Sequence, residues 1–408
     1  LLEEERVWMV RLQAIEAAGA LRMKEVAPRL HQIVQSERAT YEEIQAGIAS
    51  LVQIYDAISL EEVEKLSKSN RAGLRHLACS LAAHFEVEGG EGVVARLLKD
   101  PHPDVRIAAL NALSLVYRHR MERPLELLAA PLQDAHPAVA ITASYGALLL
   151  DPKLGAEHFR RWLKDDLPEH RRLAAAALAA SGERGALLAL EEMPHLSDPY
   201  VKANLALGLL GQRKEVRLAC DTISEFLETE KRMWMWDKRP NPLFQVLSPS
   251  QVRYIDQIPN YPEAIDQMTR LSLVSELALV EDPRALPALK RFLQEKRWGI
   301  TGVAAATLLQ EGDETALDMV RELLNDPDPN IRLQACLVLA HFGKEESVML
   351  HLQGAYGGAD HEKKLHILEA LGRVGAPESF SFLVSVLSEP FPILRVAAAA
   401  ALIQSVNR

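Results

Sequence analysis

Hydrophobic residues recur along the chain at positions that place them on one face of a helix. In residues 105–113, Val105, Ala109 and Leu113 are four residues apart and fall on the same side of a helix. Residues 331–339 repeat the same order, with a basic residue after the first apolar one and alanine four positions after it. A stripe with a small residue at its centre is typical of a helix that packs closely against another.

The same pattern recurs about every 31 residues. If the first residue of the pattern is taken as an anchor, the anchors are Val10, Glu43, Leu74, Val105, Val139, His170, Val201, Thr269, Ile300, Ile331, Lys363 and Leu394. The interval between Val201 and Thr269 is about two periods long, which predicts one degenerate unit within it. A second helical stretch precedes most anchors, so each unit is expected to be a helical hairpin. Self-similarity at this period is the signature of a solenoid.

The sequence therefore predicts an all-α protein, an α-solenoid that winds as a right-handed superhelix of about 12 or 13 hairpins. We expect an N-terminal array over residues 1–211, a degenerate repeat or insertion over 212–262 and a C-terminal array over 263–408, together forming one continuous solenoid. Leu1 and Leu2 align with residues that close the first helix of a later hairpin, and the chain does not begin with Met. We therefore expect a truncated first repeat and a fragment of a longer protein.

The turn before each anchor indicates the type of repeat. Proline stands two residues before the anchor in six units, and aspartate stands five residues before it in four. The resulting pattern, Asp-x-x-Pro-x-Val-Arg-x-x-Ala-x-x-x-Leu, resembles HEAT repeats, in particular the short bacterial HEAT-like type of the phycobilisome lyases. The tetratricopeptide and ankyrin signatures are absent. The resemblance implies a curved, armadillo-like scaffold for protein–protein interaction, and it suggests a bacterial origin.

A basic residue follows the anchor in most units, in register with the turn aspartates. Such a row could bind phosphates or acidic peptides. The recurring aspartates favour a structural ladder instead, in which each arginine bonds to a turn aspartate or to a carbonyl of a neighbouring unit. The predicted ladder residues are Arg106, Arg171, Arg332, Arg395, Asp100, Asp134, Asp165 and Asp326.

The segment from 231 to 262 departs from the repeat. Prolines at positions 240, 242, 249, 259 and 262 exclude an uninterrupted second helix. Two tryptophans in this segment could fill the gap left by a degenerate helix, or they could contact a partner, because Trp and Arg often carry interface energy. Its positive charge in an acidic chain favours an acidic partner. The candidate contact residues are Trp234, Trp236, Lys231, Arg232, Lys238 and Arg239.

Residues three, six and ten positions after the anchor share a face that lies away from the buried stripe. Stacked second helices would place this face on the inside of the curve. Its uncharged polar, His and Tyr side chains suit recognition of a peptide or protein through hydrogen bonds, although it could be only a solvated face. The candidates are Asn111, Tyr145, Asn204, Gln334, His341 and His366.

Composition narrows the classes of partner. The formal net charge of −10 argues against nucleic acid, which would require a basic surface. No uncharged apolar stretch is long enough to span a membrane. The three cysteines lie far apart, which fits a reducing compartment and predicts a cytoplasmic location. A single His-Glu dipeptide, His361-Glu362, makes the two-iron site of deoxyhypusine-hydroxylase-type HEAT arrays unexpected, and no metal or other cofactor is predicted.

These patterns together predict a non-catalytic scaffold that binds a partner protein or peptide on its concave face. The alternatives are an enzyme resembling the bilin lyases or the HEAT-like DNA glycosylases, or a structural segment of a larger assembly. Bilin-lyase-like activity is the main enzymatic alternative. The sequence contains no glycine-rich phosphate loop and no Gly-x-Ser-x-Gly motif, so no catalytic residue is predicted.

Overall fold

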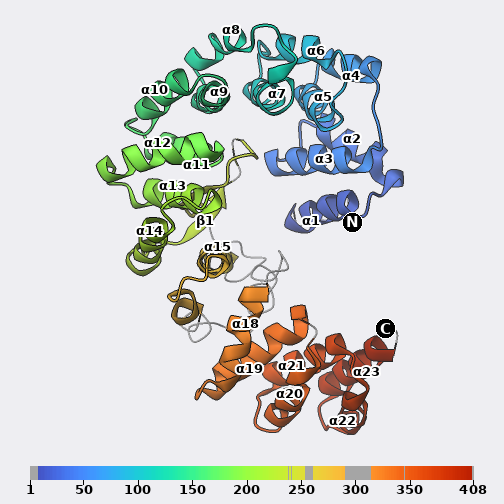
Figure 1. The fold of residues 1–408 in the computed structure, drawn as a ribbon. Coiled ribbons are helices and arrows are strands. Elements are labelled where there is room, and N and C mark those ends of the chain that lie inside the picture. The colour runs from blue at the N-terminus through green and yellow to red at the C-terminus, as the bar shows by residue number, and fades with distance from the viewer. Residues whose placement is uncertain are drawn as a thin grey trace. The chain divides into compact units, whose positions relative to one another are not determined.

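The computed structural model describes residues 8–237, 239, 241–252, 261–289, 314–343 and 345–406. Within these residues the chain is a succession of helices with one two-stranded sheet (Figure 1). It divides into two compact units. The first comprises residues 1–215 and 236–248, and the second comprises residues 216–235 and 249–408.

The first unit has two layers of helices, which Figure 1 shows in blue to green. The anchor helices form the inner layer: α1 (Trp8–Ala20), α3 (Tyr41–Ile54), α5 (Ala72–His84), α7 (Pro103–Leu115), α9 (Pro137–Leu150), α11 (Pro168–Ala179) and α13 (Pro199–Gly211). The helices between them are α2 (Ala27–Gln35), α4 (Leu60–Ser67), α6 (Gly90–Leu97), α8 (Pro124–Leu128), α10 (Pro152–Trp162) and α12 (Gly182–Glu192). Short 3₁₀ turns extend several connections: η1 (Lys24–Val26), η2 (Tyr117–His119), η3 (Pro131–Gln133) and η4 (Met193–His195).

The second unit continues the alternation of helices. Its helices are α14 (Val216–Thr229), α15 (Tyr261–Leu279), α18 (Glu314–Glu322), α19 (Pro329–Val338), α20 (Met349–Tyr356), α21 (His361–Val374), α22 (Phe380–Val386) and α23 (Pro392–Val406). The short turns are η5 (Leu323–Asn325), the π-helical η6 (Leu339–Gly343), η7 (Glu346–Val348) and η8 (Pro377–Ser379). Strands β1 (Trp234–Asp237) and β2 (Val246–Pro249) pair with each other, and the boundary between the units falls within both.

The prediction of an all-α solenoid is confirmed. Each predicted anchor lies in a helix, except Ile300, which falls outside the described residues. In α7 the predicted stripe is buried, since Val105, Ala109 and Leu113 are completely inaccessible to solvent, whereas the first anchor, Val10, is 39% exposed. Adjacent helices approach closely because the facing side chains are small. A Cβ atom added to Gly146 of α9 would lie 2.5 Å from the Ser114 hydroxyl of α7.

Proline and aspartate residues in the preceding turns determine where the anchor helices begin. Proline occupies the first turn of α7, α9, α11 and α13, where its missing N–H group would have no helical partner in any case. The turn aspartates accept backbone N–H groups ahead of the helix. Asp100 accepts from His102 at 2.9 Å, and Asp134 accepts from His136 at 2.8 Å. These contacts fix the sharp reversal between the two helices of a hairpin.

The long interval between Val201 and Thr269 does not contain a complete additional helical hairpin among its described residues. Its described residues form the end of α13, helix α14, strands β1 and β2, and the start of α15. Helix α14 packs against α15. The two helices therefore make one hairpin whose connection is lengthened by an insertion that contains the two strands. The predicted division at residues 211 and 262 stays a prediction.

Candidate functional site

Part of this insertion lies on the inner surface of the first unit. We call residues 241–248 the inner segment. Its residues contact side chains of α7, α9 and α13, at positions three or six residues after the anchor of each helix. Figure 1 shows this stretch of chain, in yellow-green, inside the curve of the anchor helices.

The first contact is a buried carboxamide site around Asn241, which is completely inaccessible to solvent. The Asn241 Nδ2 group donates to Asn111 Oδ1 and to Thr142 Oγ1, each at 3.0 Å. Its Oδ1 atom accepts from Asn111 Nδ2 at 3.1 Å and from the backbone N–H of Leu243 at 3.0 Å. Both donor positions and both acceptor positions of the amide are therefore used. A buried polar network that is fully satisfied in this way selects one side chain strongly.

The second contact depends on a tight turn over residues 241–244. The Phe244 N–H group donates to the Asn241 carbonyl at 3.1 Å, with Pro242 at the second position, which suits its fixed φ angle. The turn directs Phe244 onto Tyr145 of α9. The ring centroids lie 5.3 Å apart at an interplanar angle of 61°, an edge-on arrangement. Both rings are buried, and burial raises the pKa of the Tyr145 hydroxyl.

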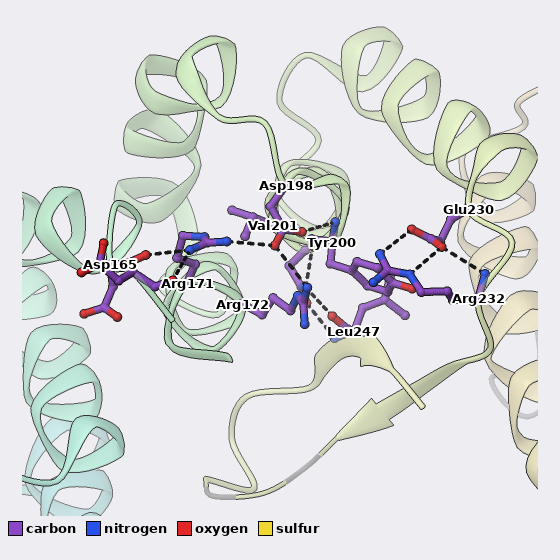
Figure 2. Close-up of polar contacts among 11 residues, drawn as sticks. Asp165, Arg171, Arg172, Asp198, Tyr200, Val201, Glu230, Arg232 and Leu247 are labelled. Atoms are coloured by element: carbon purple, nitrogen blue, oxygen red, sulfur yellow. Dashed lines mark hydrogen bonds and ion pairs between the residues drawn. The ribbon is translucent and has the colours of Figure 1, made fainter. Parts of the chain in front are cut away.

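The third contact is made by Asn204 of α13 with the backbone of Leu247. The Leu247 N–H group donates to Asn204 Oδ1, and Asn204 Nδ2 donates to the Leu247 carbonyl, both at 2.9 Å. Asn204 Nδ2 also donates to the Tyr200 carbonyl at 2.8 Å. The Asn204 carboxamide thus makes the same pair of hydrogen bonds to the Leu247 backbone that a neighbouring β-strand would make. Figure 2 shows Leu247 beside Tyr200.

The inner segment contacts the helices mainly through every third residue. Asn241, Phe244 and Leu247 are completely buried. Leu243 and Gln245 are exposed between them. Helices α7, α9 and α13 therefore contact the Asn241 side-chain amide, the Phe244 ring and the Leu247 backbone, which are spaced three residues apart.

The structure thus covers three of the predicted inner-face residues with the chain's own segment. Tyr145 and Asn204 are buried, and Asn111 is half-buried against Asn241. The helical wheel shows where a face lies and not what covers it, so the binding of a partner by these side chains stays a prediction. The sequence analysis did not identify Asn241, Phe244 or Leu247. The Asn-Pro pair followed by hydrophobic residues outside any helical pattern was the available signal.

The two tryptophans have different environments. Trp234 is completely buried in the second unit, with its ring 4.3 Å from that of Phe226. The Arg270 guanidinium lies over the Trp234 ring, 3.7 Å from the ring centroid. The backbone N–H group of Trp234 donates to Asp266 Oδ1 at 2.7 Å. This placement favours the gap-filling alternative for Trp234. Trp236 is only half-buried.

The basic residues around them have acceptors within the chain. The Lys231 ammonium donates to the Glu228 carbonyl at 2.7 Å. Arg232 pairs with Glu230 at 2.9 Å (Figure 2) and holds the pKa of that carboxyl below its ordinary value. The Arg239 guanidinium contacts Asp237 at 3.1 Å and, at 3.5 Å, Glu42 of α3. Lys238 lies outside the described residues. The acidic partner stays a prediction.

The arginines of the predicted ladder hold the turns together. Arg106 donates to both carboxylate oxygens of Asp134, at 2.8 and 2.9 Å, and to the carbonyls of Asp100 and Pro101. Asp100 itself accepts two bonds from Arg75. Burial acts to raise the pKa of Asp100, but these bonds outweigh it and lower the pKa. Arg332 and Arg395 reach the carbonyls five and six residues before them in the same way.

The ladder changes where a unit lacks its arginine. The position after the anchor Val139 is Ala140, so Asp165 pairs with His170 instead, at 2.9 Å. Figure 2 shows Arg171 between the Asp165 turn and Asp198, whose carboxylate lies 3.6 Å away. The Asp326 carboxylate accepts the backbone N–H of Asp328 at 2.9 Å.

The predicted inner-face residues of the second unit are less enclosed. His341 and His366 are half-buried, and burial lowers the pKa of His341. Gln334 is buried, and its Oε1 atom has no hydrogen-bond partner among the described residues. The described part of the chain contains no group of three or more His, Cys, Asp or Glu side chains arranged to hold a metal ion. None of the described helices is long and apolar enough to cross a membrane.

Comparison with known families identifies the repeat. A model of HEAT repeats matches residues 318–403, and a model of the single HEAT repeat matches residues 92–119. The chain contains HEAT repeats. The matched models describe HEAT repeats in general, so the closer resemblance to phycobilisome lyases stays a prediction. No curated protein matches the sequence.

Solved structures similar to this HEAT-repeat protein include crystal structures of the karyopherin Kap121p. A mutant of Kap121p is 12% identical with a TM-score of 0.37, and the match covers 99% of this chain and 48% of that one. Kap121p bound to RanGTP is 15% identical with a TM-score of 0.31, covering 98% and 43%. Kap121p bound to the extreme C-terminus of the protein phosphatase Cdc14p is 15% identical with a TM-score of 0.32, covering 98% and 44%. The chain thus spans less than half the length of these proteins, and similarity this low says nothing about what it binds.

Proposed function

We propose that this HEAT-repeat protein is a non-catalytic scaffold that binds a segment of a partner protein, or a peptide, on the inner surface of its solenoid. The observation that carries the proposal is the docking of the inner segment. Three inner helices hold a non-helical stretch of chain by a side-chain amide, an aromatic ring and a backbone unit. A surface that binds one such stretch has the chemistry to bind another.

The contacts suit recognition of a polypeptide. Asn204 reads only the backbone N–H and C=O groups of Leu247, which nearly every residue type supplies. Asn111 and Tyr145 read side chains and so add specificity. All three stand on helices whose opposite faces are fixed in the core. A rigid support lowers the entropy cost of ordering the binding groups.

The rival hypotheses have no comparable support among the described residues. A structural segment of a larger assembly would use the ends of the solenoid rather than its inner surface. The cytoplasmic location also stays a prediction.

Site-specific photocrosslinking in the source cells tests the proposal. A photoreactive amino acid replaces exposed Gln245 of the inner segment or half-buried His366 of α21. The matched control carries it at Glu157, which is exposed on α10 in the outer layer. We expect one protein to crosslink in near-stoichiometric amount from an inner position and not from Glu157. Crosslinking from Glu157 alone, or recovery of nucleic acid or pigment at the inner positions, contradicts a protein-binding inner surface.

A further inference from the structure

We propose that the inner segment is an intramolecular ligand, and that it occupies a recognition surface for a partner segment of the same chemistry. That partner segment is uncharged at its contact positions and carries asparagine, an aromatic residue and an aliphatic residue at every third position, with a turn after the asparagine. The inference rests on the proposed function, because it names the chemistry of what the scaffold binds.

The asparagine position is the most selective. The site around Asn241 offers one N–H donor from Asn111, and two acceptors, Asn111 Oδ1 and Thr142 Oγ1. The Thr142 hydroxyl proton is already directed to the Ala138 carbonyl, at 2.7 Å. An aspartate in place of Asn241 would set a carboxylate oxygen against both acceptors in a fully buried site. The site therefore accepts a carboxamide and rejects an acid of the same shape.

The other two positions are defined more broadly. The Tyr145 ring meets Phe244 edge-on in a fully buried contact, which favours an aromatic partner. Asn204 requires a residue with a backbone N–H group at the position of Leu247, so it excludes proline there. Complete burial of the Leu247 side chain favours an aliphatic residue.

The surface beneath the inner segment has the composition of a groove that can be emptied. Its floor is polar where the segment touches Asn111, Thr142 and Asn204. Water can satisfy these groups when the segment leaves. The apolar stripe that holds α7 in place, including Ala109 and Leu113, is buried where α7 packs against α5 and α9. Release of the segment would leave this stripe in place, and the apolar surface that it exposes is that of Tyr145, Phe244 and Leu247.

Covalent connection explains why the segment normally occupies the surface. A segment tethered to its own site experiences an effective concentration of order millimolar. A free partner with equal contacts competes poorly unless its concentration is comparable or it makes further contacts elsewhere. The inner segment thereby sets a threshold for binding and excludes segments that lack the asparagine.

Direct binding of a peptide to the full chain tests this inference. The probe is a fluorescein-labelled peptide with the sequence of residues 237–249, followed by fluorescence anisotropy. The release variant is Asn241→Asp, which weakens the segment and leaves the surface unchanged. The matched control is Gln245→Glu, which makes the same chemical change at an exposed position of the same segment. Phe244→Ala serves as a second release variant if Asn241→Asp does not fold.

We expect the release variant to bind the probe at least about tenfold more tightly than the unmodified chain or Gln245→Glu, because the tethered competitor is weakened. Adding Asn204→Leu to the release variant should abolish the gain. A probe with aspartate at the Asn241 position should not bind. Equal binding of the probe to the unmodified chain and to both folded release variants overturns the inference.

The two proposals can fail separately. If a protein crosslinks from an inner position while the probe binds no variant, the scaffold function stands and the inner segment is a fixed part of the fold. If the probe binds the release variant while no protein crosslinks from any inner position, the groove chemistry stands and the proposed cellular function fails.

Discussion

Replacement of Asn204 by leucine is the sharpest test of how the inner segment is held. The Asn204 side chain is 1% exposed and makes three hydrogen bonds, two of them to the Leu247 peptide unit. Leucine has a similar size but neither donates nor accepts. The substitution therefore removes the polar contacts while it largely preserves the packing volume.

The size of the effect follows from the groups that lose their partners. The N–H and C=O groups of Leu247 would stay buried without hydrogen bonds, at a cost of about 1–3 kcal/mol each. The Tyr200 carbonyl keeps its place in α13 and adds little. We expect a loss of about 2–6 kcal/mol, limited by the free energy that holds the segment on the surface. Beyond that limit the segment detaches and water satisfies its backbone.

Hydrogen exchange at the Leu247 amide measures this effect directly. A loss of about 2 kcal/mol corresponds to exchange about 30-fold faster, because 1.4 kcal/mol is a factor of ten. Amides within α7 and α13 should keep their protection. Gln245→Leu, the same amide-to-leucine change at an exposed position of the segment, should leave exchange unchanged. Unaltered exchange at Leu247 in Asn204→Leu would refute the clamp, and unfolding of the whole first unit would refute a separable segment.

Three further predictions concern the helical array. Ala109→Leu should overpack the contact between α7 and its neighbours and lower the free energy of unfolding by about 1–3 kcal/mol in denaturant titration, whereas no change would place Ala109 outside the core. Arg106→Lys should cost about 2 kcal/mol, since an ammonium cannot bond both oxygens of Asp134 and two carbonyls together, and a thermal midpoint equal to that of the unmodified chain would contradict the ladder. Burial lowers the pKa of His76 to about 4, so the folded state binds its proton less readily than the unfolded state, and about 3 kcal/mol of stability should disappear as pH falls from 6.5 to 4. His76→Leu should flatten that part of the stability–pH curve, and an equally steep curve would assign it to other groups.

The sequence by itself determined the helices and the residues that hold them together. A stripe of apolar residues with alanine at its centre requires a helix with one closely packed face, whatever the rest of the chain does. The turn residues are equally local, because Pro103 and Asp100 act on backbone groups a few positions away. These features were predictable since each depends on neighbours within one or two turns of helix.

Only the tertiary structure decided what the inner surface touches. Asn111 and Asn241 are 130 positions apart in sequence, and Asn204 and Leu247 are 43 apart. Periodicity identified Asn111 and Asn204 as members of a polar face, but it carries no information about a non-helical segment that returns to cover them. Their partners depend on the curvature of the stacked helices and on the path of the insertion. For the same reason, composition alone could not separate Trp234, which is packed beneath Arg270 in a core, from half-buried Trp236 two residues away.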